Sequence, residues 1–228
     1  MSASDDASIE LVSYITLRRV VGVLGVALPI LVAVWGLALL DPPRLLPSIS
    51  DYYSLRTRDV FVGVLFAIAW FLFTYRGYDR EDDVAGNLAC IFALGVALFP
   101  DSGSRLDRTI HFLSATAMFL TLAYFSLFLF TRSSGSPTPR KLVRNKIYRA
   151  CGITILGCIA LIAAYMWTLE HTALARLVPV FWLETFALWA FGFAWFVKGE
   201  TLFQDRRVAA GVAEAAESAS QIERKAIP

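Results

Sequence analysis

Residues 20–40 read VVGVLGVALPILVAVWGLALL, a run without a single charged side chain. A helix of about 20 apolar residues crosses the roughly 30 Å of hydrocarbon in a bilayer, so this stretch predicts a transmembrane helix. The whole chain shares its character, because 57% of the 228 residues are hydrophobic and only 18% are charged. About a quarter of the residues are charged in a soluble domain. The composition therefore predicts an integral membrane protein and excludes a soluble enzyme, a disordered chain and a nucleic-acid-binding protein.

Five further apolar runs follow the first, and no run alternates with the period of two that a membrane strand requires. The sequence thus predicts an all-α integral membrane protein with six transmembrane helices. The predicted domain covers residues 20–200, with a cytoplasmic segment at 1–19 and a cytoplasmic tail at 201–228. The runs are residues 20–40, 60–75, 84–99, 110–131, 147–168 and 177–197, of which the second and third are short for a span.

Basic residues set the predicted orientation. Lys and Arg near the ends of spans are retained on the cytoplasmic side. Most of the 21 Lys and Arg residues fall on one side when the N-terminus is placed in the cytoplasm, and residues 132–149 are especially rich in them. Six spans return the chain to the side where it started, so both termini are predicted to be cytoplasmic.

Polar side chains collect at the opposite, non-cytoplasmic ends of the predicted spans. The loop after the first span contains PSISDYY at residues 47–53, and Asp101 follows the third span. Together these groups predict an outward-opening polar pocket. The candidate ligand-binding residues are Ser50, Asp51, Tyr52, Tyr53, Arg58, Asp59, His111, Ser114 and Glu184.

Glu184 is the most informative of these residues, because it lies seven positions, or roughly 10 Å, inside the last predicted span. A carboxylate within a membrane costs several kcal/mol unless it is neutral, paired or facing water. Glu184 could act as a proton carrier, a ligand anchor or a general base. It could equally be a hydrogen-bonded carboxyl that ties helices together through His111, Tyr52 or Arg58.

Other members of the set also have two interpretations. Tyr52 and Tyr53 could form the rim of a ligand-binding mouth, or belong to an aromatic belt at headgroup depth. Arg58 could hold an anionic headgroup through charge-assisted hydrogen bonds, or be neutralised by Asp59.

No familiar catalytic motif is present, and no cofactor or metal is predicted. The chain lacks CxxC, HExxH, a phosphate-binding glycine loop and a G-x-S-x-G turn. Glu184, His111 and Asp101 are the candidate catalytic residues, and they could supply the three ligands of a zinc ion only if the spans converge. Three cysteines fall within predicted spans and are expected to pack as small side chains: Cys90, Cys151 and Cys158.

Several motifs resemble an uncharacterised family of bacterial polytopic membrane proteins, known as a domain of unknown function. They are SISDYY at 48–53, RDVFVG at 58–63, YRGYD at 75–79, ALGVALFP at 93–100, HF at 111–112, FWLE at 181–184 and KGE at 198–200. A weaker resemblance links PSISD at 47–51 to the DRAM and Sfk group, although the Gly-x-x-Pro-Glu that follows in that group is missing here. The resemblance implies a six-span, multi-pass protein of the bacterial cytoplasmic (inner) membrane and brings no activity with it.

Three functions remain open from the sequence. Binding of a lipid or small amphipathic ligand asks the least, since it needs only the outer polar residues. An intramembrane hydrolase or transferase would need Glu184, His111 and Asp101 in contact, and a proton-coupled transporter or channel would need polar groups along both halves of a path. Membrane lipids are the predicted partners. A homo-oligomer stays open, because Gly22-x-x-Gly25 suits packing within a chain as well as between chains.

Overall fold

The computed structural model describes residues 3–77, 79–133, 136–169 and 172–199. Within these residues the chain is all-helical, which confirms the all-α part of the predicted fold class. The α-helices are α1 (Ala3–Leu39), α2 (Arg58–Thr74), α3 (Arg80–Leu98), α4 (Arg105–Tyr124), α5 (Pro139–Thr168) and α6 (Pro179–Lys198). Three short elements join them: the 3-10 helices η1 (Ser50–Ser54) and η3 (Ala173–Leu177), and the π-helix η2 (Phe125–Leu129). The predicted tail at 201–228 lies outside the described residues.

Four of the described helices are long and apolar enough to cross a membrane. They are Ile15–Leu39, Arg105–Leu129, Pro139–Thr168 and Pro179–Lys198. The predicted second and third spans correspond to α2, which has 17 residues, and α3, whose 19 residues begin with four charged ones. By helix length and composition, the structure thus supports a membrane protein in which four of the described helices could span the bilayer.

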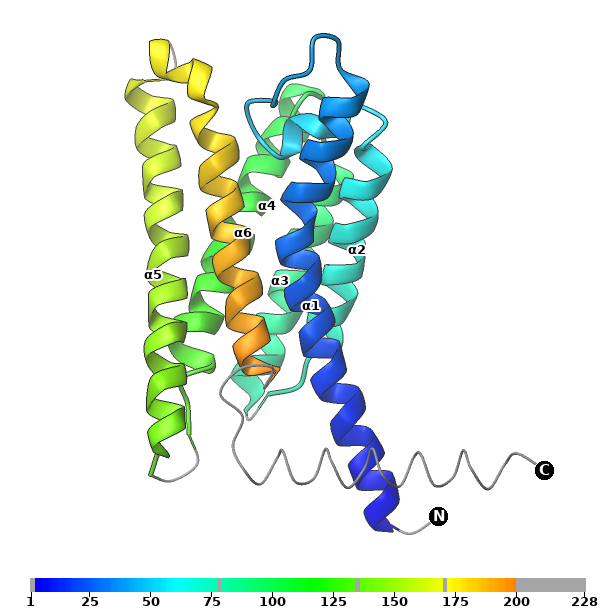
Figure 1. Ribbon diagram of the computed structural model, residues 1–228, viewed down its shortest axis with the longest axis vertical. Helices are drawn as coiled ribbons and strands as arrows, with labels where there is room; N and C mark the ends of the chain where they lie inside the picture. The colour runs from blue at the N-terminus through cyan, green and yellow to red at the C-terminus, as the bar shows by residue number, and fades with distance from the viewer. Residues whose placement is uncertain (1–2, 78, 134–135, 170–171, 200–228) are drawn as a thin grey trace, which may run out of the picture.

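The helices form a closed ring (Figure 1). Each α-helix packs against the next one in the chain, and α6 returns to pack against α1. The connections that contain η1 and η3 lie at one end of the ring, whereas α1 begins and α6 finishes at the other. Residues far apart in the sequence are therefore brought together at the η1 end.

Small residues let α1 and α6 approach closely. A Cβ atom at Gly192 would lie 2.7 Å from the backbone oxygen of Gly22, and a Cβ atom at Gly25 would lie 2.9 Å from the Phe191 ring. Such distances leave no room for a side chain. Gly22 and Gly25 therefore serve packing within this chain.

Aromatic rings and cations pack together at the end of the ring where α6 finishes. The buried ring of Trp195 has its centroid 5.3 Å from that of Phe130, and Lys198 Nζ lies 5.2 Å from the centre of the Phe130 ring. Arg19 donates a hydrogen bond of 3.2 Å to the Gly199 carbonyl. The Arg19 bond holds α1 against the end of α6, and the contacts of Phe130 hold the residue after η2 against the last turn of α6.

Candidate functional site

A cavity of about 770 Å³ lies between α4, α5 and α6 at the η1 end of the ring. Its volume falls within the range of small-molecule sites in proteins. We call it the carboxylate cavity, because its polar lining contains Ser48, Ser50, Asp51, Asp101 and Glu184. Its remaining walls are mostly apolar and come from Phe112, Ala115 and Phe119 of α4 and Ile159, Ile162 and Ala163 of α5, among others.

The loop before η1 is shaped by its own side chains. The Ser48 backbone N–H and hydroxyl donate to Asp51 Oδ2 at 2.8 and 2.9 Å, and the Asp51 backbone N–H donates to Ser48 Oγ at 3.1 Å. Reciprocal bonds between residues three apart satisfy the free donors at the start of a helix, as in a capping box. This turn fixes where Ser50 and Asp51 lie.

Two hydrogen bonds attach this loop to the first turns of α6. Glu184 Oε2 accepts the Ile49 backbone N–H at 2.7 Å, and the Phe181 N–H donates to the Pro47 carbonyl at 2.9 Å. Glu184 therefore ties α6 to this loop through the Ile49 backbone N–H, and not to His111, Tyr52 or Arg58, the partners that the sequence suggested. It also lines the cavity, so the structural role leaves a ligand-facing role open.

A third segment joins through Asp101, in the connection between α3 and α4. Ser50 Oγ donates to Asp101 Oδ2 at 2.8 Å and lies 3.0 Å from Ser48 Oγ. Four residues singled out from the sequence, Ser50, Asp51, Asp101 and Glu184, thus meet at one end of one cavity.

The carboxylates of this cavity lack cationic partners. Among the described residues, none of Asp51, Asp101 and Glu184 forms an ion pair. Arg108 Nε donates to the Asp101 carbonyl at 3.2 Å, leaving the carboxylate unpaired. In the described part of the chain the buried Asp101 Oδ1 also has no hydrogen-bond partner. Among the described residues, the direct hydrogen-bond partners of these carboxylates are therefore neutral groups.

Burial raises the pKa of Asp51 above its ordinary value of 3.8. The hydrogen bonds from Ser48 and the proximity of His111 lower it, while the nearby charge of Asp101 raises it. Burial and like charge together outweigh the hydrogen bonds. Asp51 therefore holds its proton to higher pH than an exposed aspartate.

His111 and Ser114 lie outside the lining of the carboxylate cavity. The buried His111 has its Nδ1 2.7 Å from the Phe99 carbonyl oxygen, which joins the start of α4 to the end of α3. Ser114 packs against Gly95, where a Cβ atom would lie 2.3 Å from Ser114 Oγ. Both side chains therefore face α3.

The remaining predicted residues lie in η1 and at the start of α2. Tyr52 is fully buried, and its hydroxyl accepts the Leu46 N–H at 3.2 Å. The Arg58 guanidinium lies 4.7 Å from the centre of the Tyr53 ring, and Arg58 and Asp59 are both exposed. None of these four predicted residues lines the carboxylate cavity.

The candidate catalytic residues do not form a metal site. Across the described ranges, no three His, Cys, Asp or Glu side chains are grouped so that they could hold a metal ion. Asp101, His111 and Glu184 therefore do not make the three-ligand set that a catalytic zinc needs. Cys90, Cys151 and Cys158 are buried free thiols, consistent with packing residues.

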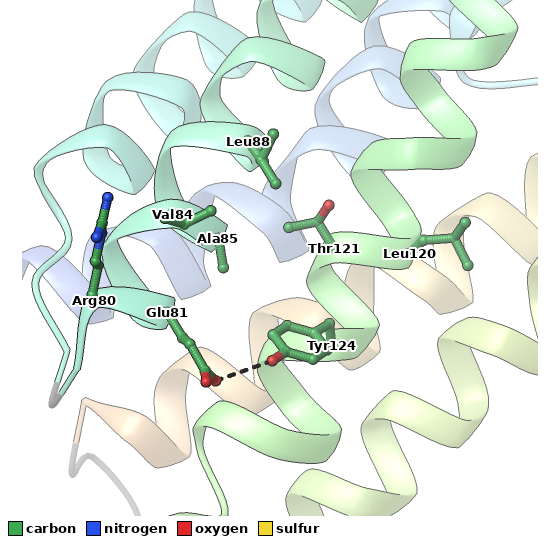
Figure 2. Close-up of a pocket in the computed structure, with 8 residues that line it drawn as sticks. All are labelled: Arg80, Glu81, Val84, Ala85, Leu88, Leu120, Thr121 and Tyr124. Carbon is green, nitrogen blue, oxygen red and sulfur yellow. Dashed lines mark hydrogen bonds between the residues drawn. The ribbon is translucent and has the colours of Figure 1, made fainter.

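A second pocket, of about 470 Å³, lies between α3 and α4 toward the opposite end (Figure 2). Its apolar lining comes from Val84, Ala85, Leu88 and Leu120, and beside them Tyr124 donates to Glu81 Oε2 at 3.3 Å. Arg132 also forms an ion pair with Glu81 and lowers the pKa of its carboxyl. The Glu81 carboxylate is thus already satisfied, which distinguishes this pocket from the carboxylate cavity.

Sequence reasoning missed Ser48 and the apolar walls of the cavity. Ser48 could have been found, because a Ser three residues before an Asp is a recognisable capping turn pattern. The walls carried no such signal, since apolar residues that face a cavity and those that face lipid are the same types.

Compared with known proteins, this chain matches no family model, no curated protein and no solved structure.

Proposed function

We propose that this protein binds a lipid or a small amphipathic ligand in the carboxylate cavity. The single observation behind the proposal is the division of that cavity, which joins three carboxylates and two serines at one end to apolar walls on α4 and α5. Wall residues Phe112 and Phe119 are seven positions apart on α4, so the apolar wall extends roughly 10 Å along the helix. A ligand with a polar head and an apolar chain complements both parts.

We further propose a six-span topology in a bacterial inner membrane, with both termini cytoplasmic and the cavity opening on the other side. The asymmetry of the two ends supports it. Lys141, Arg144 and Lys198 belong to the end where α6 finishes, and the unpaired carboxylates belong to the other. Basic residues mark the cytoplasmic side of a membrane protein.

Filling the cavity tests ligand binding. Ala163 lines the cavity, and its neighbour Ala164 on α5 is exposed without lining it. We expect Ala163→Phe to remove co-purifying lipid in native mass spectrometry and to lower the affinity for a fluorescent 12-carbon amphiphile by tenfold or more. Ala164→Phe is the matched control and should bind like the wild type. Equal binding by all three proteins would place the ligand elsewhere.

A hydrolase or transferase is the less favoured alternative. General acid–base catalysis needs a proton-transferring group within hydrogen-bond reach of the reacting atoms. His111, the histidine proposed for that role, lies outside the cavity lining and has its Nδ1 against the Phe99 carbonyl.

A proton-coupled transporter is favoured by one observation, the three carboxylates without ion pairs. Against it, the cavity walls on α4 and α5 are almost entirely apolar beyond that end. Proton uptake by protein in liposomes, driven by a pH gradient and blocked by Glu184→Gln, would favour transport over binding alone.

A further inference from the structure

The polar lining of the carboxylate cavity is unusual in its charge. Three of its groups are carboxylates, and among the described lining residues there is no Lys, Arg or His. A cavity that binds an anionic headgroup would be expected to have positively charged side chains in its lining, because charges at a binding site complement those of the ligand. The sign of the lining therefore bears on the chemistry of the ligand head.

The serine hydroxyls at the carboxylate end of this lining already donate hydrogen bonds, whereas the hydroxyls of Thr116 and Tyr165 belong to the α4 and α5 walls. Ser48 Oγ donates to Asp51, and Ser50 Oγ donates to Asp101. The Ile49 N–H, which approaches from the loop, donates to Glu184 Oε2. What remains at this end of the cavity is the acceptor capacity of the carboxylates of Asp51, Asp101 and Glu184. A ligand head that supplied only acceptors would leave these oxygens unsatisfied.

We propose, building on the proposed function above, that the carboxylate cavity selects an amphipathic ligand whose head is a primary ammonium group. An ammonium offers three N–H donors and a positive charge. It would reach the carboxylates of Asp101 and Glu184 while its chain follows the α4 and α5 walls. An ammonium of this kind is found both in a free long-chain amine and in the headgroup of an ethanolamine lipid.

The same cation would relieve repulsion among the carboxylates. The charge of Asp101, in the α3–α4 connection, raises the pKa of Asp51, and that of His111, on α4 outside the lining, lowers it; Glu184 of α6 lines the same cavity as the two aspartates. Ionised carboxylates close together in a poorly solvated site disfavour one another. A bound ammonium favours their ionised forms, whereas a fatty-acid carboxylate adds one more negative charge.

Three matched probes test the proposal. Each carries a fluorophore on a 12-carbon chain and ends in a primary amine, a hydroxyl or a carboxylate. Affinities are measured at pH 7 with the full-length protein in nanodiscs of phosphatidylcholine, a lipid whose headgroup lacks an N–H donor. The signal from probe that partitions into empty nanodiscs is subtracted. We expect the amine to bind at least tenfold more tightly than the hydroxyl, which is the factor for one charge-assisted hydrogen bond.

Charge variants identify the groups that recognise the head. Asp101→Asn and Glu184→Gln should each lose most of the preference for the amine while still binding the hydroxyl probe, which reports an intact cavity. Asp41→Asn removes an exposed aspartate just beyond α1, outside the cavity lining, and should keep the preference. Competition by added phosphatidylethanolamine would identify the ethanolamine headgroup as the source of the ammonium, and its failure would identify the free amine.

The outcomes separate this inference from the proposed function. If the three probes bind equally and Ala163→Phe weakens all of them, the cavity binds amphiphiles without selecting an ammonium, and only the inference fails. If the carboxylate probe binds most tightly, the inference is overturned. If no probe binds the wild-type protein above the empty nanodisc, the proposed function fails as well.

Discussion

At the scale of single residues, Glu184 shows how one carboxylate can serve both folding and binding. Its Oε2 accepts the N–H of Ile49, a residue only 4% exposed. We expect Glu184→Gln to change the free energy of unfolding by less than about 1 kcal/mol, because the amide oxygen can still accept that bond. Glu184→Leu should cost about 1–3 kcal/mol, because it leaves a buried donor unsatisfied. Detergent–SDS unfolding titrations measure both, and equal losses in the two variants would contradict the assigned hydrogen bond.

Asp51 gives the molecule a predictable response to pH. Because burial raises its pKa in the folded state, the folded protein holds the Asp51 proton more tightly than the unfolded chain does. The stability that this proton contributes is fully present below the unfolded pKa and is lost as the pH rises through the folded pKa. In the window above pH 3.8, Asp51→Asn should therefore lose less thermal stability with rising pH than the wild type.

The comparison with Asp51→Asn isolates this one group. An asparagine oxygen can still accept the bonds from Ser48, so the turn before η1 is retained. Every other ionisable side chain is the same in the two proteins, so the difference between their pH profiles reports the change at residue 51. Parallel melting temperatures at every pH would show that Asp51 titrates normally.

The sequence identified candidate residues by their type and by their depth in the predicted spans. It placed a residue correctly where the position along the chain alone decides at which end of the ring the residue lies. Asp101 and Glu184 needed only the order of the spans to be placed at the same end. The order of the spans was not enough to place the side chains of the loop residues. The hydrogen bonds between Ser48 and Asp51 fix the turn, and the turn sets where the η1 side chains point. Those bonds turn Ser50 toward the cavity and bury Tyr52 in the core, an outcome that residue types do not specify.

At the scale of helices, the close contact between α1 and α6 depends on glycine. A Cβ atom at Gly192 would meet the backbone oxygen of Gly22 and the side chain of Val26, each at 2.7 Å. Backbone cannot move aside as a flexible side chain can, so we expect Gly192→Ala to destabilise the protein by about 1–3 kcal/mol. Gly157→Ala on α5 is the matched control, since nothing lies within 4 Å of its added Cβ atom.

Gly157→Ala should be neutral or stabilise the protein by up to about 1 kcal/mol, because alanine favours a helix more than glycine does. Unfolding titrations of the two alanine variants in one detergent give the difference directly. Equal effects at the two positions would contradict the assigned packing of α1 against α6.

Apolar runs predicted where the α-helices lie, but neither the charged starts of α1, α4 and α5 nor the short elements between the helices. The predicted last span starts at residue 177, whereas α6 starts at Pro179, because Leu177 ends η3 and Val178 adopts a left-handed conformation with φ 45°. Proline suits the first turn of a helix, where its missing N–H has no intrahelical partner. Hydropathy does not register such a break, since residues 177–180 are all apolar.

At the scale of the whole molecule, the closed ring gives the two ends different chemistry. Antiparallel helices return the chain to the same end after every second helix, so the connections containing η1 and η3 share one end with the carboxylates (Figure 1). Lys198 and Phe130 belong to the other end, where α1 contacts the last turn of α6. The proposed orientation follows from this asymmetry together with the tendency of basic residues to stay cytoplasmic.

Orientation can be tested with single cysteines, because the native thiols are buried. Ser54 is exposed in η1, and Ser136 is exposed in the connection between α4 and α5. With both termini cytoplasmic, Ser54→Cys should react with a membrane-impermeant maleimide in intact bacterial cells, and Ser136→Cys should react only after permeabilisation. The unsubstituted protein is the control and should stay unlabelled. The opposite pattern would invert the topology and place the carboxylate cavity toward the cytoplasm, where a ligand would have to enter from inside the cell.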